Sequence, residues 1–244
     1  VTVLDEISPK ITAPETISTV ATSADGAVVN YTIPVGTDNC SVTTALTAGF
    51  ADGATFPIGT TVVTYVATDG SGNDVSASFN VEVVGVAPVI VVPADITVNT
   101  DANECGAIVP FAATDATGIP NSVVTYDIQP NTFFAVGTTT VTATATNAVG
   151  TAISTFDVTV IDDIKPEIAA PNNISTVATS ATGVVVNYTT PVGTDNCSVT
   201  TEMTSGLADG ATFPIGTTVV TYVATDGSGN DASASFNVEV VGIA

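Results

Sequence analysis

A near-perfect internal repeat constrains the fold of this chain more than any other feature. The segment Ala54–Asn73 (ATFPIGTTVVTYVATDGSGN) recurs unchanged at Ala211–Asn230, and a divergent copy occupies Asn131–Gly150. Repeated segments of this kind indicate homologous structural units arranged in tandem. We therefore predict three domains of roughly 80 residues each, close to the smallest size at which one hydrophobic core folds alone.

The two outer domains are nearly the same and the middle one diverges, so the underlying repeat is a pair of an A-type and a B-type domain. We assign 7–86 to the first A-type domain, 87–162 to the B-type domain and 163–244 to the second A-type domain. Val1–Asp5 resemble Val158–Asp162 at the end of the B-type domain, and residues 1–6 are therefore interpreted as the tail of a preceding repeat. The chain is therefore expected to be an excerpt from a longer array.

The repeated segment has the pattern of a β-strand. Within Thr60–Thr68, Val63, Tyr65 and Ala67 alternate with a second set of residues that would face the opposite side. Short Thr/Val-rich segments separated by Gly, Pro and Asn turns, with no helical period, favour a β-sandwich. The predicted fold class is all-β, with three tandem immunoglobulin-like β-sandwich domains in an extended array.

The charge balance excludes several classes of partner. The chain has 24 acidic residues, two lysines (Lys10 and Lys165) and no arginine, which gives a net charge of −22. A nucleic-acid binder needs cations that neutralise phosphates, and an anionic membrane surface also attracts basic segments. No apolar run approaches the ~20 residues of a membrane-spanning helix. We expect neither nucleic-acid binding nor membrane insertion, and we expect the chain to attract cations.

The composition also argues against catalysis. Histidine, arginine and tryptophan are absent from the chain. Serine triads, arginine-assisted phosphoryl transfer and imidazole–metal sites therefore have no residues to build them. A pair of carboxylates would serve a glycosidase, but aromatic residues that stack on sugars make up only 6% of the chain. We predict that the segment is not an enzyme.

Each domain contains one cysteine. Cys40 and Cys197 occupy the same position in the two A-type domains, whereas Cys105 occupies a different position in the B-type domain. Pairing across domains would need Cα atoms within about 7 Å of each other, which a linear array does not readily provide. We expect three free, buried thiols that fill small apolar spaces.

Acidic segments are predicted to converge at one end of each A-type domain. In an immunoglobulin-like sandwich the loop before the third strand, the loop before the last strand and the incoming chain lie near the same end. All the residues concerned offer hard oxygen ligands of the kind that Ca²⁺ prefers. In the second A-type domain they are Asp162, Asp163, Asp195, Asn196, Asp226, Ser228 and Asn230. In the first they are Asp5, Glu6, Asp38, Asn39, Asp69, Ser71 and Asn73.

Turn formation is the competing interpretation of these residues. Asp, Asn and Gly stabilise turns through their own backbone hydrogen bonds and need no metal to do so. The segment Asp226–Asn230 matches only the first half of a calcium loop, because no glutamate follows at the usual distance. Convergence of three acidic segments in a chain with two cations keeps the calcium hypothesis open. The B-type domain has only Asp115 and Asn147 at the corresponding end, and we predict no comparable site there.

Several motifs of the A-type domains together resemble one known family. These are Thr37–Cys40 (TDNC), Phe56–Thr61 (FPIGTT), Ala67–Asp69 (ATD) and Ser71–Asn73 (SGN). They are similar to the HYR (hyalin repeat) domain, an immunoglobulin-like extracellular module, and the B-type domain resembles it less closely. The resemblance implies a secreted or surface adhesion protein. Typical members carry two cysteines that can pair, of which the A-type domains keep only the second and the B-type domain only the first. The paired duplication and the Thr/Val-rich, Lys-poor composition also look like giant surface adhesins of gliding Bacteroidota.

Together these features predict a structural and adhesive segment of a long cell-surface or secreted protein. It would act as an extended stalk, stiffened by Ca²⁺ at its acidic ends, with neighbouring repeats and a surface glycan or protein as its partners. Two alternatives remain. One is a glycan- or protein-binding module that uses the B-type domain or the segments Ala45–Phe50 and Glu202–Leu207. The other is a set of accessory domains attached to a secreted enzyme.

Overall fold

The computed structural model describes residues 5–112 and 115–243. All secondary structure assigned within these ranges is β-strand, which confirms the predicted all-β class. Residues 1–4 of the proposed preceding repeat, together with Ala113, Thr114 and Ala244, lie outside the described residues.

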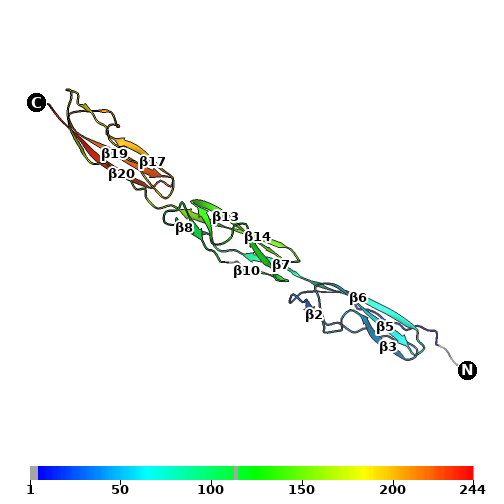
Figure 1. Cartoon of the computed structure of the whole chain (residues 1–244). Coiled ribbons are helices and arrows are strands. Elements are labelled where there is room, and N and C mark those ends of the chain that lie inside the picture. Colours follow the sequence, from blue (N-terminus) through cyan, green and yellow to red (C-terminus); the bar gives the residue numbers. More distant parts are fainter. Residues whose placement is uncertain (1–4, 113–114, 244) are drawn as a thin grey trace. The chain divides into compact units, whose positions relative to one another are not determined.

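The first A-type domain is built on a four-stranded sheet with the order β1-β6-β5-β3 (Figure 1). Its strands are β1 (Ile17–Val20), β2 (Ala27–Val28), β3 (Val42–Ala48), β4 (Thr55–Phe56), β5 (Gly59–Asp69) and β6 (Asp74–Val84). The long strands β5 and β6 form an antiparallel hairpin, β1 runs parallel to β6, and β2 pairs with β4 on its own. Two sheets in one small domain match the predicted sandwich.

The second A-type domain repeats this arrangement. Its strands are β15 (Ile174–Val177), β16 (Val184–Val185), β17 (Val199–Ser205), β18 (Thr212–Phe213), β19 (Gly216–Asp226) and β20 (Asp231–Val241). The sheet order β15-β20-β19-β17 is that of the first domain, with the same separate short pair, β16 and β18. The two A-type domains therefore share strand topology as well as sequence.

The B-type domain has the same main sheet as the A-type domains and one additional strand pair. Its strands are β7 (Val86–Val91), β8 (Ile96–Asn99), β9 (Gly106–Val109), β10 (Asp115–Ile119), β11 (Val123–Tyr126), β12 (Thr132–Ala135), β13 (Gly137–Thr146) and β14 (Thr151–Ile161). The main sheet has the order β11-β13-β14-β8, and β12 pairs with β9 and β10 with β7 in two small sheets. Its divergent sequence thus keeps the main sheet, with β8 parallel to β14 as β1 is to β6 and β11 antiparallel to β13 as β3 is to β5. The strand pair that it adds is β10 with β7.

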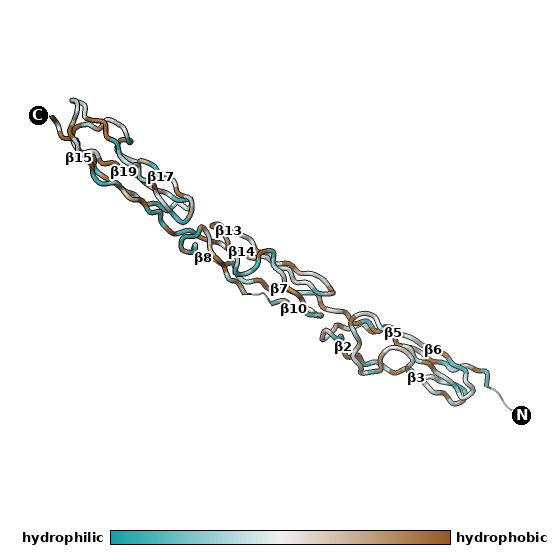
Figure 2. The backbone as a smooth tube through the Cα atoms, viewed as in Figure 1, coloured by the Kyte–Doolittle hydropathy of each residue, from teal (hydrophilic) through white to brown (hydrophobic). Residues whose placement is uncertain are grey.

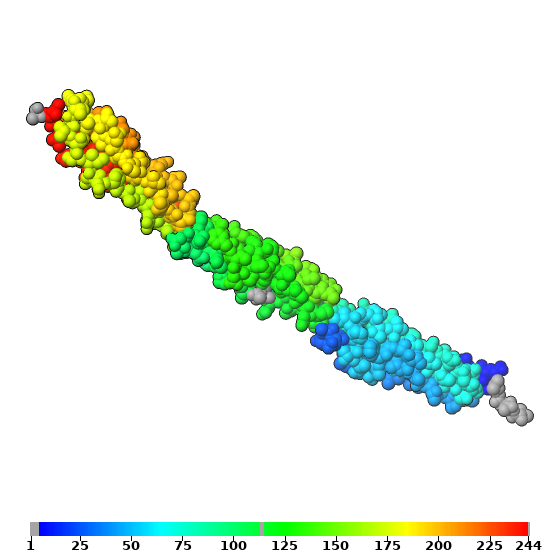
Figure 3. Space-filling view, viewed as in Figure 1, coloured from blue at the N-terminus to red at the C-terminus, as the bar shows by residue number. Residues whose placement is uncertain are grey.

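Spatial proximity divides the chain into two compact units, and the B-type domain contributes to both. Unit 1 comprises residues 1–92, 113–127 and 142–155, and unit 2 comprises residues 93–112, 128–141 and 156–244. In the surface view, unit 1 carries the blue and cyan first A-type domain and unit 2 carries the yellow-to-red second A-type domain (Figure 3). The domain boundaries drawn from the repeat remain predictions.

The alternation of side chains along the long strands builds each core. On β5, Val63, Tyr65 and Ala67 are buried, whereas Val62 is 52% exposed, which confirms the predicted two-faced strand. Figure 2 shows apolar and polar positions interleaved along the strands of both units. A strand of period two that buries one face gains its stability mainly from apolar area removed from water.

A hydrogen-bonded pair of tyrosines lies at the core of each A-type domain, Tyr31 with Tyr65 and Tyr188 with Tyr222. The Tyr31 hydroxyl donates to the Phe50 carbonyl oxygen at 2.7 Å and lies 3.0 Å from the Tyr65 hydroxyl. Desolvation and the neighbouring Tyr65 hydroxyl raise the pKa of Tyr31. Its ring also meets Phe79 edge-to-face with centroids 5.0 Å apart. The polar tip is therefore satisfied while the ring fills the core.

The junction between the first A-type domain and the B-type domain lies within unit 1 and is closely packed. Ile119, at the end of β10, packs against the core of the first domain. A Cβ atom placed on Gly85 would lie 2.5 Å from Val149 Cγ2 and 2.7 Å from the Ile119 carbonyl oxygen. The corresponding Gly242 has more room, since the nearest atom to its Cβ would be 3.7 Å away, on Ile215.

We predict that Gly85→Ala destabilises unit 1 by about 1–3 kcal/mol, because overpacking forces backbone and side chains apart. The Val149 side chain can rotate, but the Ile119 carbonyl belongs to the backbone and cannot yield cheaply. Denaturant unfolding of the full chain, with hydrogen-exchange mass spectrometry of peptides around residue 85, measures the loss. Gly242→Ala is the matched control and should change stability little. Equal losses in the two variants would contradict this account of the junction.

Candidate metal site at the head of the second A-type domain

The hairpin turn between β19 and β20 is organised by one buried carboxylate. Asp226 is 7% exposed, and its Oδ1 accepts the backbone N–H of Ser228 at 2.9 Å and of Asn230 at 2.8 Å. Its Oδ2 accepts the Asn230 side-chain amide at 2.8 Å. These are the self-contained hydrogen bonds of a turn-forming aspartate. The turn interpretation therefore accounts for Asp226, Ser228 and Asn230 without a metal.

Asp69 forms the same turn in the first A-type domain, and both carboxyl groups have a pKa below the ordinary range. For Asp69 the largest cause is the hydrogen bond from the Asn73 side chain, supported by backbone N–H groups. For Asp226 burial alone would raise the pKa, but the hydrogen bonds from Asn230, Ser228 and Gly229 together outweigh it. Hydrogen bonds donated to a carboxylate stabilise its charged form.

The Asp226 turn also holds the incoming chain. The Asn230 side-chain amide donates to the backbone carbonyl of Asp162 at 3.0 Å, just where the chain leaves β14. The first domain repeats the contact, with Asn73 donating to the carbonyl of Asp5 at 2.9 Å. We call this end of each A-type domain, where the chain enters, its head.

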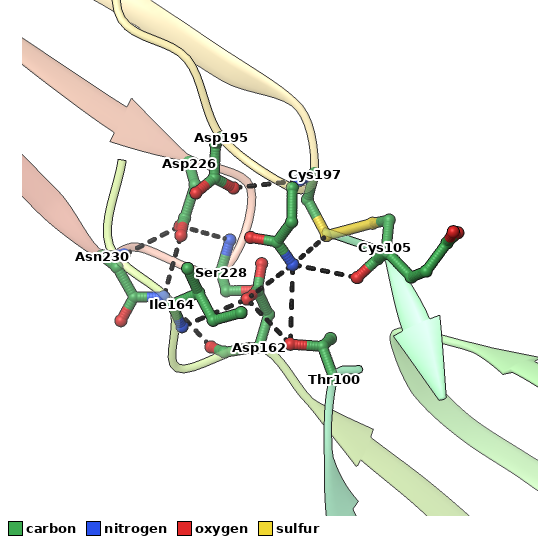
Figure 4. Close-up of a disulfide and its surroundings, with 11 residues drawn as sticks. Thr100, Cys105, Asp162, Ile164, Asp195, Cys197, Asp226, Ser228 and Asn230 are labelled. Carbon is green, nitrogen blue, oxygen red and sulfur yellow. Dashed lines mark hydrogen bonds between the residues drawn. A yellow bond between two sulfur atoms is a disulfide. The ribbon is translucent and has the colours of Figure 1, made fainter. Parts of the chain in front are cut away.

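A second turn, between β16 and β17, brings more oxygens to this head (Figure 4). The Cys197 N–H donates to Asp195 Oδ2 at 3.0 Å. The neighbouring Asn196 side-chain amide donates to Asp162 Oδ1 at 3.3 Å and to the Glu104 carbonyl at 3.0 Å. The head thus collects residues from the linker, from the turn before β17 and from the B-type domain, all within unit 2.

Three side-chain oxygens at this head are buried and have no hydrogen-bond partner. They are Asp162 Oδ2, Asp195 Oδ1 and Asn196 Oδ1. Asp162 is only 4% exposed, and its carboxylate oxygen lies within 4.8 Å of one from Asp195. Buried polar atoms are rarely left unpaired, and two carboxylates this close repel one another. A cation among these oxygens would remove both costs.

The chemistry of these donors fits a hard cation. Carboxylate and amide oxygens are the ligands that Ca²⁺ prefers. Cys197 Sγ lies within the same 4.8 Å group, but it is bonded in a disulfide and is not a thiolate ligand. A hollow of about 340 Å³ lies beside the cluster and is lined in part by Asp195, Asn196 and Lys165.

The remaining predicted ligand in this domain lies apart from the cluster. Asp163 is exposed, and its Oδ2 accepts the Asn99 side-chain amide at 2.7 Å. Of the seven residues named from the sequence, the structure therefore brings three together with unpaired oxygens. Three others build the hairpin turn, and Asp163 binds a neighbour.

The head of the first A-type domain has the same components in a more open setting. Asp5, Asp38 and Cys40 form a group within 4.8 Å, and Glu6 is exposed and outside it. The Ile7 N–H, followed by the Cys40 thiol and the Asn39 amide, lowers the pKa of Asp5. The hydrogen bond to Asp5 and its charge in turn raise the pKa of Cys40. Among the described residues, the buried side-chain oxygens that lack a partner all lie at the head of the second A-type domain, including its linker residue Asp162.

The cysteines contradict the expectation of three free, buried thiols. Cys105 and Cys197 form a disulfide with Cα atoms 4.7 Å apart, and Cys40 is free but exposed. The turn from Asp101 to Gly106, between β8 and β9, presents Cys105 directly to the head of the next domain. The sequence contained a signal for this bond. Each type of domain carries the cysteine that the other lacks, so a cysteine of one type could pair with a cysteine of the other.

The B-type domain replaces the acidic turn with a neutral one. Asn147 Oδ1 accepts the N–H of Val149 at 2.9 Å and of Gly150 at 3.1 Å. Its amide donates to the carbonyls of Val86 at 2.9 Å and Pro120 at 2.8 Å. The same turn is thus made without charge. Among the described residues, acidic or thiol groups close enough to share a metal occur at the two A-type heads.

Comparison with known proteins agrees with this architecture. A family model for the HYR domain matches residues 4–83 and 161–240. The chain belongs to the HYR domain family. This confirms the resemblance drawn from the TDNC and FPIGTT motifs, and it places both A-type domains in the family.

The HYR relatives are much longer proteins. The chain is 36% identical to Hyalin of Strongylocentrotus purpuratus over 97% of its own length and 21% of that protein. It is likewise 36% identical to Hyalin of Lytechinus variegatus over 99% of its length and 48% of that protein. The chain therefore spans about a fifth to a half of these relatives. Among solved structures, Drosophila N-cadherin EC1-3 aligns with 95% of this chain and 99% of its own, at 11% identity and a TM-score of 0.39, a likeness too weak to bear on function.

The HYR chain is extracellular or displayed at the cell surface, as its relatives indicate. Its disulfide agrees with this, because disulfides persist in oxidising compartments. The described residues include no helix that is long and apolar enough to cross a membrane.

The turn aspartates predict a specific dependence of stability on pH. Because the folded-state pKa of Asp226 lies below its unfolded value, the stabilisation is fully present above that unfolded value, about 3.9. It is lost as pH falls through the lower folded-state pKa. Asp226→Asn should therefore unfold with a flatter dependence on pH below about 4 while keeping the turn, as Asn147 does. Denaturation midpoints measured across this range test it.

Asp231→Asn removes an exposed charge five positions further along and serves as the control for net charge. It should follow the wild-type pH profile. An identical flattening in both variants would mean that general charge repulsion, rather than the Asp226 turn, sets the acid sensitivity.

Proposed function

We propose that this HYR chain is a structural and adhesive segment of a cell-surface or secreted protein, in which the head of the second A-type domain binds Ca²⁺. The observation that carries the calcium part is the set of three buried, unpartnered oxygens on Asp162, Asp195 and Asn196. The adhesive part is supported by membership of the HYR family and by relatives that are extracellular repeat proteins.

Calcium at this head would join two pieces of chain. Asp162 belongs to the linker after β14, whereas Asp195 and Asn196 belong to the turn before β17. A Ca²⁺ ion takes about six to eight oxygen ligands, so these three side chains would be completed by further oxygens such as water. Tying the linker to the turn would restrict bending at this point of unit 2.

The negative charge of the chain also favours binding of Ca²⁺. The net charge of −22, with two lysines in the whole chain, leaves few internal cations to neutralise buried carboxylates. Clusters of one sign raise the local concentration of counter-ions. A buried water would also give one unpaired oxygen a partner. Because water is neutral, it would leave the repulsion between the two carboxylates in place, whereas a divalent cation would offset it.

The proposed mechanical role follows from the tandem domains and their charge. Mutual repulsion opposes compaction of the chain, and stiff linkers would keep the domains spaced for display. Neighbouring repeats, and a surface protein or glycan, are the proposed partners. The compositional likeness to gliding adhesins belongs to this proposal and rests on sequence alone. The relatives do not point to an enzyme, and we propose no catalytic role.

Calorimetric titration of the full chain with Ca²⁺ tests the site. We expect saturable binding and a higher melting temperature in Ca²⁺ than in chelator, since a ligand that binds the folded state stabilises it. Asp162→Asn should abolish the binding attributed to this head. Asp163→Asn is the matched control, because it removes the same charge from the adjacent, exposed residue. Loss of binding in both variants, or no binding to the wild type at millimolar Ca²⁺, would overturn the proposal.

Hydrogen exchange then tests the stiffening separately from binding. Ca²⁺ should slow amide exchange in the linker around residues 162–166 and in the turn at 195–197. Peptides spanning 85–88, at the apolar junction of unit 1, should exchange at the same rate with and without Ca²⁺. Uniform slowing at both junctions would contradict a role confined to this head.

A further inference from the structure

Cys40 occupies the same local structure as the disulfide-bonded Cys197. Its N–H donates to Asp38 Oδ2 at 2.9 Å, as the Cys197 N–H does to Asp195 at 3.0 Å. The linker residue beside each cysteine is also held alike, by Asn73 in one head and by Asn230 in the other. The head of the first A-type domain is therefore folded in the form that accepts a disulfide partner.

The two heads differ in what faces them. At Cys197 the B-type turn supplies Cys105, and the Asn196 amide donates to the Glu104 carbonyl of that turn at 3.0 Å. At the first head the Asn39 amide turns back to Asp5 Oδ2 at 3.1 Å. Cys40 and Asn39 are exposed, whereas Cys197 and Asn196 are half-buried. Among the described residues, the turn Asp101–Gly106 contacts Cys197 and Asn196 at the second head.

We infer that Cys40 is a bonding site for the cysteine of a second B-type turn, presented by a B-type domain joined ahead of residue 6. The direction follows from the linker. Asp162 comes directly from β14 and is held by Asn230, and Asp5 is held by Asn73 in the same way. A domain whose last strand ran into Asp5 would therefore bring its cysteine turn to Cys40. Cys105 of this chain is already bonded and does not serve.

The bond forms by thiol–disulfide exchange with a small disulfide such as oxidised glutathione. One cysteine thiolate attacks the glutathione disulfide, forms a mixed disulfide and releases one glutathione thiolate. The thiolate of the other cysteine then attacks the protein sulfur of that mixed disulfide and releases the second glutathione. Two protein thiols are oxidised to one disulfide, while glutathione disulfide takes up two electrons and two protons to give two thiols.

The test extends the full chain by a second copy of residues 87–162, placed where residues 1–5 stand. This substitution keeps the register, because Val1–Asp5 corresponds to Val158–Asp162. The extended chain is equilibrated in a glutathione buffer with chelator, digested without reduction and analysed by mass spectrometry. We expect a disulfide between Cys40 and the added copy's cysteine, with maleimide labelling of Cys40 at least about tenfold slower than in the original chain.

Two variants of the extended chain keep the result interpretable. Cys105→Ser in the added copy alone should restore fast labelling of Cys40. In every sample the Cys105–Cys197 disulfide of the original chain is the internal control, because its presence shows that a B-type turn has met an A-type head. Cys40 found free, bound to glutathione, or paired with Cys40 of a second molecule while that reference disulfide is intact would overturn the proposal. Because the experiment is run in chelator, its failure is distinct from failure of the calcium proposal.

Discussion

The long hairpin of each A-type domain is closed by a buried aspartate, and both the core and the head depend on that closure. In the second domain the Asp226 carboxylate accepts hydrogen bonds from backbone and side-chain N–H groups of the turn. The Asn230 side-chain amide in turn donates to the backbone carbonyl of Asp162 in the linker. Strands β19 and β20 are thereby held in the register that buries Val220 and Phe236. One turn therefore orders the core on one side and the incoming chain on the other.

The two junctions of the chain are made by different physical means. In unit 1, Asn147 forms the turn without charge, and Ile119 packs against the core of the first domain. In unit 2, a disulfide joins Cys105 to Cys197 beside carboxylates whose oxygens lack partners. The first junction is held by apolar packing, whereas the second combines a covalent bond with a cluster of acidic side chains. The junction that follows an A-type domain therefore differs in kind from the junction that follows the B-type domain.

Much of the fold and part of the candidate site could be predicted from sequence. The two-residue period of Thr60–Thr68 correctly placed Val63, Tyr65 and Ala67 on one buried face, because strand geometry is local. Loop convergence brought Asp162 and Asp195 together as expected. The sequence also grouped Asp226 and Asp163 with these ligands. In the structure their carboxylates instead accept hydrogen bonds, Asp226 from its own turn and Asp163 from Asn99. Local sequence does not show which donors a carboxylate will meet. The cysteine expectation was wrong because it assumed that domains in a linear array do not bring two cysteines within bonding distance, whereas the turn that carries Cys105 meets the next head.

The sequence by itself determined the repeat, the strand pattern, the family and the acidic character of the A-type heads. These properties follow from side-chain period, turn preference and charge, all of which act over a few neighbouring residues. Only the tertiary structure decided that Cys105 meets Cys197, which lies 92 residues further along the chain, and that three oxygens at the second head remain unpaired. Both outcomes depend on which groups the folded junction brings within bonding distance. The distance between residues far apart in the chain cannot be read from local sequence.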